Sequence, residues 1–307
     1  MRNGKNILIT GIGGYIGRNF TEIASKLFPN KKFYGIDKTI SQNINIKFIK
    51  CDLTDKEKLK TILVSLKPSI IFNLAGTGIS IDLNLQQFVN ANLLPTISLL
   101  ETITELSSIK PRIILIGSAA EYGRIPIKKL PAVENYPLNP LTNYGCAKAL
   151  QSILANYYTN LGMDIVIARL FNIIGKNMSK NLSIGSFIKQ IEKIKRNKIP
   201  PKIFVGDINV RRDFIDLRDA IKAICLIAKK GKTGEVYNVC SGRAVSVRNI
   251  LVKLCKSNSK KIKIVADPKR IRKHDVKNIY GSYKKLYLHT GWKPNFTIEQ
   301  TLRDIIY

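Results

Sequence analysis

The sequence predicts an α/β fold built on a doubly wound parallel sheet. Short, nearly continuous apolar runs alternate with segments whose apolar residues recur every three or four positions, and a glycine-rich turn follows the first run. The 307 residues suffice for one large domain or two ordinary ones. Strands that are buried on both faces are continuously apolar, and the helices that connect them cover those faces.

The expected strands are the apolar runs of the first half. They are Asn6–Thr10, Lys32–Ile36, Lys47–Lys50, Ser69–Leu74, Arg112–Gly117 and Asp164–Leu170. The segments with helical spacing lie between them and are Ile16–Leu27, Lys56–Leu66, Leu85–Leu106 and Asn143–Leu161. After about residue 172 the alternation weakens, because Gly175–Gly185 is polar and Ile199-Pro200-Pro201 interrupts regular structure. Helical patterns return at Asp219–Lys229 and Ser246–Lys256.

Composition excludes several classes of protein. Hydrophobic residues make up 45% of the chain and charged residues 23%, which is typical of a globular protein and not of a disordered one. Because no apolar run approaches the ~20 residues of a membrane span, no membrane partner is expected. The N-terminus lacks a signal-peptide pattern and the five cysteines are scattered, so we expect reduced thiols and a cytoplasmic location. Two distant histidines predict no metal site.

The net charge is unusually high. The chain has 51 Lys and Arg residues against 21 Asp and Glu residues, a formal charge of +30. Such a charge attracts polyanions. However, the lysines are spread along the chain and accompany frequent Ile and Asn, which favours a coding bias that places lysine on the solvated surface. No specific nucleic-acid partner is therefore expected. A non-catalytic dinucleotide-binding protein with affinity for polyanions remains a remote alternative.

The glycine-rich turn predicts a dinucleotide site. The first strand runs into Gly11-Ile12-Gly13-Gly14-Tyr15-Ile16-Gly17 and then into a helix. Gly11 would allow the tight turn, Gly14 would let a pyrophosphate approach the backbone, and Gly17 would let the helix pack on the strand. The free N–H groups and the dipole at the start of the helix favour the negative pyrophosphate. This strand–turn–helix context is that of a Rossmann-type domain.

A carboxylate at the end of the second strand fits the same site. Asp37 lies twenty residues after Gly17, where a carboxylate binds ribose hydroxyl groups. It would repel the 2′-phosphate of NADP, so Asp37 favours NAD(H). The neighbouring Lys38 weakens that repulsion, and NADP(H) remains possible.

Three further residues form a candidate proton-transfer set. Tyr144 and Lys148 are four residues apart and lie on one face of a predicted helix, and Ser118 ends the fifth predicted strand. A phenol with a pKa of about 10 is a poor acid or base at pH 7. A nearby ammonium and an oxidised nicotinamide would lower that pKa, and matching it to neutrality needs a shift worth roughly 4 kcal/mol. A hydroxyl beside the same substrate oxygen can share the proton.

Together these residues resemble the extended short-chain dehydrogenase/reductase family of nucleotide-sugar epimerases, dehydratases and reductases. The resemblance covers essentially the whole chain and rests on Thr10–Gly17, Asp37, Cys51-Asp52-Leu53, Asn73-Leu74-Ala75-Gly76, Asn92, Ser118, Tyr144, Lys148 and Arg169-Leu170-Phe171-Asn172. Pro95 departs from the family pattern, which has glycine there, and predicts a local variation of the helix.

The resemblance implies roles for individual residues. It makes Ser118, Tyr144 and Lys148 the catalytic triad and places Asn172 near the substrate phosphates. It assigns Asp52 to the adenine amino group. The other residues that it implies for the cofactor site are Gly11, Gly14, Tyr15, Ile16, Gly17, Asp37, Leu53, Leu74, Ala75 and Gly76, together with Tyr144 and Lys148.

The second half narrows the resemblance to one group within that family. Val205–Phe214, Val236–Gly242, Asp267–Arg272 and Gly291–Pro294 are similar to the corresponding segments of the GDP-4-keto-6-deoxy-D-mannose reductases, which form GDP-D-rhamnose. This similarity implies that Arg212 and Arg272 hold the substrate diphosphate, since guanidinium groups pair well with phosphate oxygens, and that Val205 lies along the nucleotide. A surface or interdomain salt bridge is the alternative for each arginine.

One reaction can be argued against. Dehydratases of the family carry an Asp-Glu pair directly after the strand-end hydroxyl residue, where this chain has Ala119 and Ala120. An alanine methyl group cannot move a proton, so 4,6-dehydration is not expected. Glu121 is one position further along and is expected to point elsewhere. Chemistry at C4 of the sugar remains.

We therefore expect an enzyme with an NAD(P)-binding Rossmann domain over residues 1–171 and a smaller C-terminal α/β lobe over residues 172–307. The smaller lobe would mainly bind the nucleotide sugar, with elements partly interleaved. The expected reaction is NAD(P)H-dependent reduction of a nucleotide-linked 4-keto-6-deoxyhexose, best GDP-4-keto-6-deoxy-D-mannose to GDP-D-rhamnose. A 4-epimerase with tightly bound NAD is the alternative. The resemblance also implies a homodimer that uses Leu85–Leu106 and Asn143–Leu161.

Overall fold

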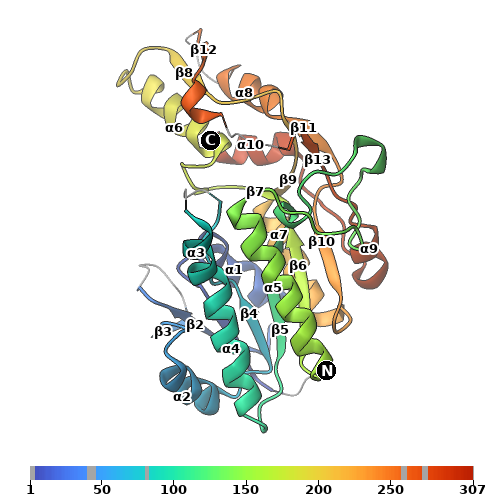
Figure 1. Ribbon diagram of the computed structural model, residues 1–307. Coiled ribbons are helices and arrows are strands. Elements are labelled where there is room, and N and C mark those ends of the chain that lie inside the picture. Colours follow the sequence, from blue (N-terminus) through green and yellow to red (C-terminus); the bar gives the residue numbers. More distant parts are fainter. Residues whose placement is uncertain (1–3, 40–45, 80–82, 257–260, 272–275, 307) are drawn as a thin grey trace.

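A computed structural model describes residues 4–39, 46–79, 83–256, 261–271 and 276–306 (Figure 1). Its centre is a seven-stranded parallel sheet with the strand order β10-β6-β5-β4-β1-β2-β3. The strands are β1 (Asn6–Thr10), β2 (Lys32–Asp37), β3 (Lys47–Lys50), β4 (Ile70–Asn73), β5 (Arg112–Ser118), β6 (Asp164–Leu170) and β10 (Val236–Val239). The predicted fold class, a Rossmann-type α/β protein with a doubly wound parallel sheet, is confirmed.

Helices cover both faces of this sheet. Alternation along β1 shows why its run is apolar throughout: Ile7 and Ile9 pack on one face and Leu8 packs on the other, and all three are fully buried. The Ile7 face carries α1 (Tyr15–Leu27) and α7 (Leu217–Lys230). The helices on the Leu8 face are α2 (Lys56–Leu66), α4 (Leu94–Glu105) and α5 (Asn143–Asn160).

The helix predicted at Leu85–Leu106 is observed as three pieces. A short α3 (Leu85–Phe88) leads into a π-helical stretch, Val89–Leu93, and then into α4. Pro95 stands at the start of α4 and has no N–H group to donate to the preceding turn. The local helix variation expected at Pro95 is thus present, as a π-helix directly before it.

A second, smaller group of elements lies beyond the carboxyl ends of the large sheet, at the top of Figure 1. Its four-stranded sheet contains β7 (Asn172–Ile174), β9 (Arg211–Asp216), β11 (Ala244–Ser246) and β13 (Asn278–Ile279), and β8 (Lys202–Val205) pairs with β12 (Lys263–Ala266). Its helices α6 (Ser183–Lys195), α8 (Val247–Lys256) and α10 (Ile298–Ile306) share a separate apolar core. From the same half of the chain, α7 and β10 join the large sheet, and α9 (Lys284–Thr290) packs against both.

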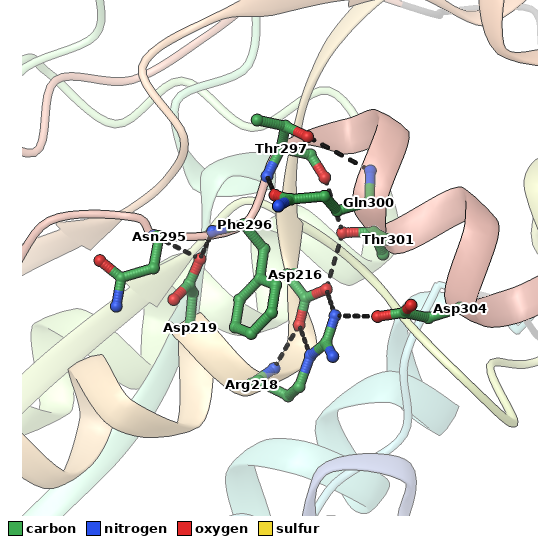
Figure 2. Close-up of polar contacts among 9 residues, drawn as sticks. All are labelled: Asp216, Arg218, Asp219, Asn295, Phe296, Thr297, Gln300, Thr301 and Asp304. Atoms are coloured by element: carbon green, nitrogen blue, oxygen red, sulfur yellow. Dashed lines mark hydrogen bonds and ion pairs between the residues drawn. The ribbon is translucent and has the colours of Figure 1, made fainter.

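Hydrogen bonds and ion pairs hold the C-terminal helix α10 at the junction between the large sheet and the smaller group of elements (Figure 2). Asp216 caps α7 by accepting from the Arg218 N–H at 2.8 Å, and its other oxygen accepts from the Thr301 hydroxyl at 2.6 Å. The Arg218 guanidinium pairs with both Asp216 and Asp304, each at 2.7 Å, and stacks 3.6 Å from the centre of the Phe296 ring. No helix of the described residues is long and apolar enough to cross a membrane.

Candidate active site

The turn between β1 and α1 needs glycine at two of the three expected positions. Gly11 has a φ of +66°, and a Cβ there would lie 2.6 Å from the backbone of Ala75. A Cβ at Gly17 would lie 2.5 Å from the Gly11 carbonyl oxygen, so this glycine lets the helix approach the turn. Gly14 is the N-cap residue of α1, and no described side chain caps this helix. Its first N–H groups therefore fit a bound anion.

Asp37 lies beside this turn. Its Oδ2 accepts from the Gly13 N–H at 2.8 Å and its Oδ1 accepts from the Lys38 N–H at 2.7 Å. The Lys38 ammonium reaches Asp52 Oδ2 at 2.9 Å. Burial raises the pKa of the Asp52 carboxyl, but hydrogen bonds from Thr54 and Lys38 outweigh it and bring that pKa below its ordinary value. The Asp52 carboxylate is thus held in its ionised form just beyond β3, and Asp37 ends β2, so both lie where the adenosine half of a dinucleotide fits.

The segment that follows β4 packs against the other side of the glycine-rich turn. The Ala75 N–H donates to the Thr10 hydroxyl at 3.3 Å, and the Thr77 N–H donates to Asn92 Oδ1 at 3.1 Å. A Cβ at Gly76 would lie 2.4 Å from the same Asn92 oxygen. Leu74 to Gly76 therefore lie against the glycine turn, at the point where the strand order reverses between β1 and β4. Leu53, which follows β3, is buried in the core on the Leu8 face of the sheet.

Tyr15 and Ile16 are the first two residues of α1 and follow the glycine turn directly. The Tyr15 side chain packs against the cores of both element groups, and its hydroxyl is buried near Gly175 without a hydrogen-bond partner among the described residues. Burial, reinforced by the Asp216 carboxylate, raises the pKa of this phenol. The Ile16 side chain packs on the first core.

The structure brings the three expected proton-transfer residues to one end of the sheet. Ser118 ends β5, and Tyr144 and Lys148 lie in the first two turns of α5. A hydrogen bond from Ser118 reaches the phenol of Tyr144. The buried Lys148 ammonium donates to the Ile116 carbonyl at 2.8 Å and to Gln151 Oε1 at 2.9 Å.

The electrostatics of this set differ from the expectation for Tyr144. Burial raises the pKa of its phenol to about 12, the hydrogen bond from Ser118 lowers it, and the Glu121 carboxylate raises it. Burial also lowers the pKa of Lys148 to about 8, against the effect of Glu121. The expected lowering of the phenol pKa is thus not produced by the protein alone, because burial outweighs the stabilisation of the phenolate. At pH 7 the protein holds a protonated phenol, which suits a proton donor.

Glu121 points into the protein, as expected. Its carboxylate is fully buried and accepts from the Ser118 N–H at 2.6 Å, from the Ser152 hydroxyl at 2.7 Å and from the Arg169 guanidinium at 2.9 Å. These three hydrogen bonds hold the carboxylate inside the protein. The turn after β5 therefore presents Ala119, Ala120 and an already paired carboxylate, and it presents no acid–base pair.

The expected substrate residues lie on the smaller group of elements. Asn172 on β7 is opposite Phe214 on β9, so Asn172 and Arg212 project from one face of this sheet, two positions apart. Asn172 Nδ2 donates to the Asp213 carbonyl at 2.9 Å, and Arg212 Nη1 donates to the Arg211 carbonyl at 2.9 Å. The side chain of Val205 is buried in the core, which limits its contribution to a nucleotide site to its backbone.

Arg272 lies outside the described residues. The segment just before it runs close to the end of β8, because a Cβ at Gly206 would lie 2.3 Å from the Arg270 carbonyl oxygen. Some residues that contact the candidate set were not predicted from the sequence. Gln151 is the clearest of them, and its position three residues after Lys148 was the signal that could have found it.

Comparison with known proteins gives a matching family model, related enzymes and a similar solved structure. The family model described as GDP-mannose 4,6 dehydratase matches residues 8–305. GDP-6-deoxy-D-mannose reductase of Pseudomonas aeruginosa is 34% identical over 216 residues, which cover 68% of this chain and 71% of that protein. GDP-6-deoxy-D-talose 4-dehydrogenase of Aggregatibacter actinomycetemcomitans is 25% identical over 301 residues, 98% of this chain and 96% of that protein. The solved structure of RMD from Pseudomonas aeruginosa complexed with NADPH matches with a TM-score of 0.85 and 26% identity, covering 98% of this chain and 97% of that one.

Proposed function

The chain belongs to the GDP-mannose 4,6 dehydratase family of extended short-chain dehydrogenases/reductases, and from this premise we propose that it reduces the 4-keto group of a nucleotide-linked 4-keto-6-deoxyhexose. The substrate that we favour is GDP-4-keto-6-deoxy-D-mannose, and the product is GDP-D-rhamnose. The relative from Pseudomonas aeruginosa, a reductase named for a GDP-linked 6-deoxy sugar, supports this choice.

One observation favours reduction over dehydration as the reaction, although the family is named for dehydration. A protonated phenol and a serine hydroxyl meet at the end of β5, and the turn that follows them offers no free carboxylate. Elimination of water needs an acid and a base beside C5 and C6. Reduction at C4 needs only a hydride and one proton, and Tyr144 supplies that proton.

The proposed roles follow from the positions of the side chains. When bound, the reduced nicotinamide supplies the hydride that adds to C4. Tyr144 donates its phenolic proton to the C4 oxygen, which completes a secondary alcohol, and Ser118 hydrogen-bonds the same oxygen. Lys148 holds a ribose hydroxyl of the cofactor, and its positive charge stabilises the phenolate that Tyr144 leaves behind. Asn172 and Arg212 hold the substrate phosphates, and the resemblance adds Arg272, whose position is not described, to this role.

NADH is the cofactor that we propose. The Asp37 carboxylate is fixed beside Gly13, where it accepts ribose hydroxyl groups and repels a 2′-phosphate. Lys38 is engaged with Asp52, which weakens its attraction for that phosphate. NADPH, which occupies the Pseudomonas aeruginosa structure, is the second choice. The five cysteines are free thiols, and this fits the reducing cytoplasm in which we propose that the enzyme works.

The test is turnover of a defined keto sugar by the purified protein. We expect GDP-4-keto-6-deoxy-D-mannose to be reduced only when NADH or NADPH is added, with one nicotinamide oxidised for each sugar reduced. Parallel reactions with the dTDP-, CDP- and UDP-linked keto sugars show whether guanosine is preferred. Interconversion of sugars without added cofactor would instead identify a 4-epimerase with tightly bound NAD and would overturn the proposal.

We also propose that a second copy of the chain covers the outer face of α5. Ile153, Tyr157 and Leu161 recur at helical spacing and are 62%, 57% and 59% exposed, and Leu94 on the neighbouring α4 is 43% exposed. An apolar stripe of this length suits a helix-to-helix contact between copies. Sedimentation should give a dimer for the wild type and a monomer for Ile153→Asp. A monomeric wild type at micromolar concentration would exclude the dimer.

A further inference from the structure

A buried set of neutral polar side chains lies behind Lys148, and the proposed mechanism leaves it unused. Gln151 is 2% exposed and accepts from the Lys148 ammonium at 2.9 Å. Its Nε2 donates to the Thr96 hydroxyl at 3.3 Å, which also accepts from Asn73 Nδ2 at 3.2 Å. Asn73 Oδ1 in turn accepts from the Thr10 hydroxyl at 2.6 Å. These contacts join α5, α4, β4 and β1.

The donor and the acceptor of each hydrogen bond in this set can be assigned from the chemistry of Lys148 and Thr96. An ammonium only donates, so the atom of Gln151 that faces Lys148 is its carbonyl oxygen. The Thr96 hydroxyl donates its own hydrogen to the Asn92 carbonyl at 2.9 Å, so it accepts from both Gln151 and Asn73. Each of these hydrogen bonds therefore joins a donor to an acceptor, and the Gln151 amide cannot turn over without placing its NH₂ against the ammonium.

We propose that Gln151 is a positioning residue for Lys148, which holds the ammonium at a fixed point between β5 and the segment that lines the proposed cofactor site. The proposal rests on the proposed function, in which Lys148 binds the cofactor ribose. The ammonium has three donors, and the Ile116 carbonyl and Gln151 occupy two of them. Both acceptors are neutral, so they fix the cation in place without cancelling the charge that the proposed function assigns to the cofactor site.

The same group of hydrogen bonds extends to Ala75, which lies in the segment that lines the proposed cofactor site. The Thr10 hydroxyl, at the far end of the set, also accepts from the Ala75 N–H at 3.3 Å. Ala75 lies against Gly11 in the glycine turn. Lys148 and the backbone of Ala75 are therefore fixed by one continuous group of buried hydrogen bonds, which sets the ammonium relative to the cofactor site and not only relative to its own helix.

The charged surroundings of Lys148 make the proposal testable by pH. Glu121, from the turn after β5, faces it and is paired with Arg169 of β6, while Tyr144 precedes it by one turn on α5. The groups that α4 and β4 contribute here, Thr96 and Asn73, are neutral. Since burial brings the pKa of Lys148 to about 8, a change in its acceptor moves the loss of the cation within an accessible pH range.

The experiment measures NADH binding by fluorescence from pH 6 to 10, with no sugar present, for the wild type, Gln151→Met and Gln151→Glu. Gln151→Met removes an acceptor of the cation, so its affinity should be ~10-fold weaker near pH 8 and should be lost at lower pH than in the wild type. Gln151→Glu keeps an acceptor and adds a negative charge, so its affinity should persist to higher pH. Thr159→Val, which removes a side-chain hydrogen bond to the backbone of the same helix, is the matched control and should behave as the wild type.

Opposite displacements of the two pH profiles support the proposal, because a loss of packing alone would not move them in opposite directions. Profiles that coincide with that of the wild type in both variants would overturn it. Circular dichroism checks folding, and if Gln151→Met fails to fold, the upward displacement in Gln151→Glu decides the question. Because no sugar is used, failure of the keto-reductase assay and failure of this experiment are separate results.

Discussion

Tyr144 and Lys148 are both protonated at pH 7, and burial is the main cause for each. Burial disfavours charge, so it raises the pKa of the phenol to about 12 and lowers that of the ammonium to about 8. The phenol is therefore ready to give a proton, whereas oxidation of an alcohol would first require it to lose one. This state suits the reductive direction and agrees with the proposed function.

The phenolic hydroxyl can be removed with little change of shape. Tyr144→Phe keeps the ring that packs edge-on against Phe88, at 5.6 Å between centroids, so cofactor binding should stay within about twofold of the wild type. Turnover should fall by ~10²–10⁴, the usual contribution of a positioned proton donor. Tyr287→Phe, at an exposed position of α9, is the control. Full activity of Tyr144→Phe with the keto sugar would remove this residue from the mechanism.

The buried ammonium of Lys148 also has a consequence for stability. Its pKa is 10.5 in an ordinary environment and about 8 in the folded protein, so between these values the unfolded chain binds more protons than the folded one. The contribution of Lys148 to the free energy of unfolding therefore rises with pH across this window, by up to about 3 kcal/mol.

Urea unfolding of the wild type and Lys148→Met at pH 7.5, 9 and 10.5 measures this rise. The difference between the two proteins should change in favour of the wild type as the pH increases. A difference that stays constant with pH would mean that the lysine is solvated in the folded state.

At the scale of elements, the docking of α10 depends on a few polar contacts. Asp216 is buried at the start of α7 and accepts from Thr301 at 2.6 Å, while Asp219 on the same helix accepts from the N–H groups of Asn295 and Phe296 at 2.8 and 2.9 Å (Figure 2). Two carboxylates of one helix thus hold the chain on both sides of the start of α10. Burial raises the pKa of Asp219 in spite of these hydrogen bonds.

Thr301→Val isolates one of these contacts. It keeps the shape of a side chain that is 2% exposed and removes the donor to Asp216, so the free energy of unfolding should fall by about 1.5–3 kcal/mol, the usual value for a hydrogen bond to a charged group. Thr61→Val, which loses a bond to the backbone of its own helix α2, should change it much less. Equal losses in urea unfolding of the two variants would show that the contact to Asp216 contributes nothing specific.

Six of the seven strands of the large sheet could be predicted because they are apolar on both faces, whereas β10 was not predicted. The bounds of β1, β3, β6 and α2 agree with the predicted segments to the residue. By contrast, β9 begins with Arg211, Arg212 and Asp213, so its sequence has no apolar run. Asp213 is nevertheless buried, because it accepts from the N–H groups of Ser241, Gly242 and Gly281, which only the folded chain brings together. Hydropathy cannot reveal a strand of this kind.

The candidate site also has one part that could be predicted from the sequence and one part that could not. The glycine turn, Asp37 and the Tyr144/Lys148 pair lie within short segments whose spacing carries their meaning, and the structure places them at one edge of the sheet. The buried polar set behind Lys148 comes from four elements, and although Thr10 and Asn73 lie within recognised motifs, no motif links them to Thr96 or Gln151. Their hydrogen bonds exist only once the sheet and its helices are assembled, so the sequence alone gave no reason to group them.

At the scale of the whole molecule, the charge is unevenly distributed. Residues 172–307 hold 31 basic and 10 acidic side chains, a net charge of +21, whereas residues 1–171 hold 20 and 11, a net charge of +9. Many of the basic residues lie on α6, α8 and the paired strands β8 and β12, and the described ones among them are exposed. This surface lies at the end of the molecule that carries the proposed substrate residues (Figure 1).

A field of this sign should speed the arrival of an anionic nucleotide sugar. We expect kcat/KM to fall as ionic strength rises, because exposed charges further apart than about 8 Å are screened at physiological salt. The double variant Lys193→Glu, Lys256→Glu reverses two exposed charges of α6 and α8 and should lower kcat/KM by ~2–5-fold at low salt with kcat unchanged. Lys26→Glu, in the last turn of α1, is the control. Because screening removes a steering effect but leaves contact effects in place, the variant and the wild type should converge at high salt; a difference that persists there would mean that these lysines touch the substrate and do not steer it.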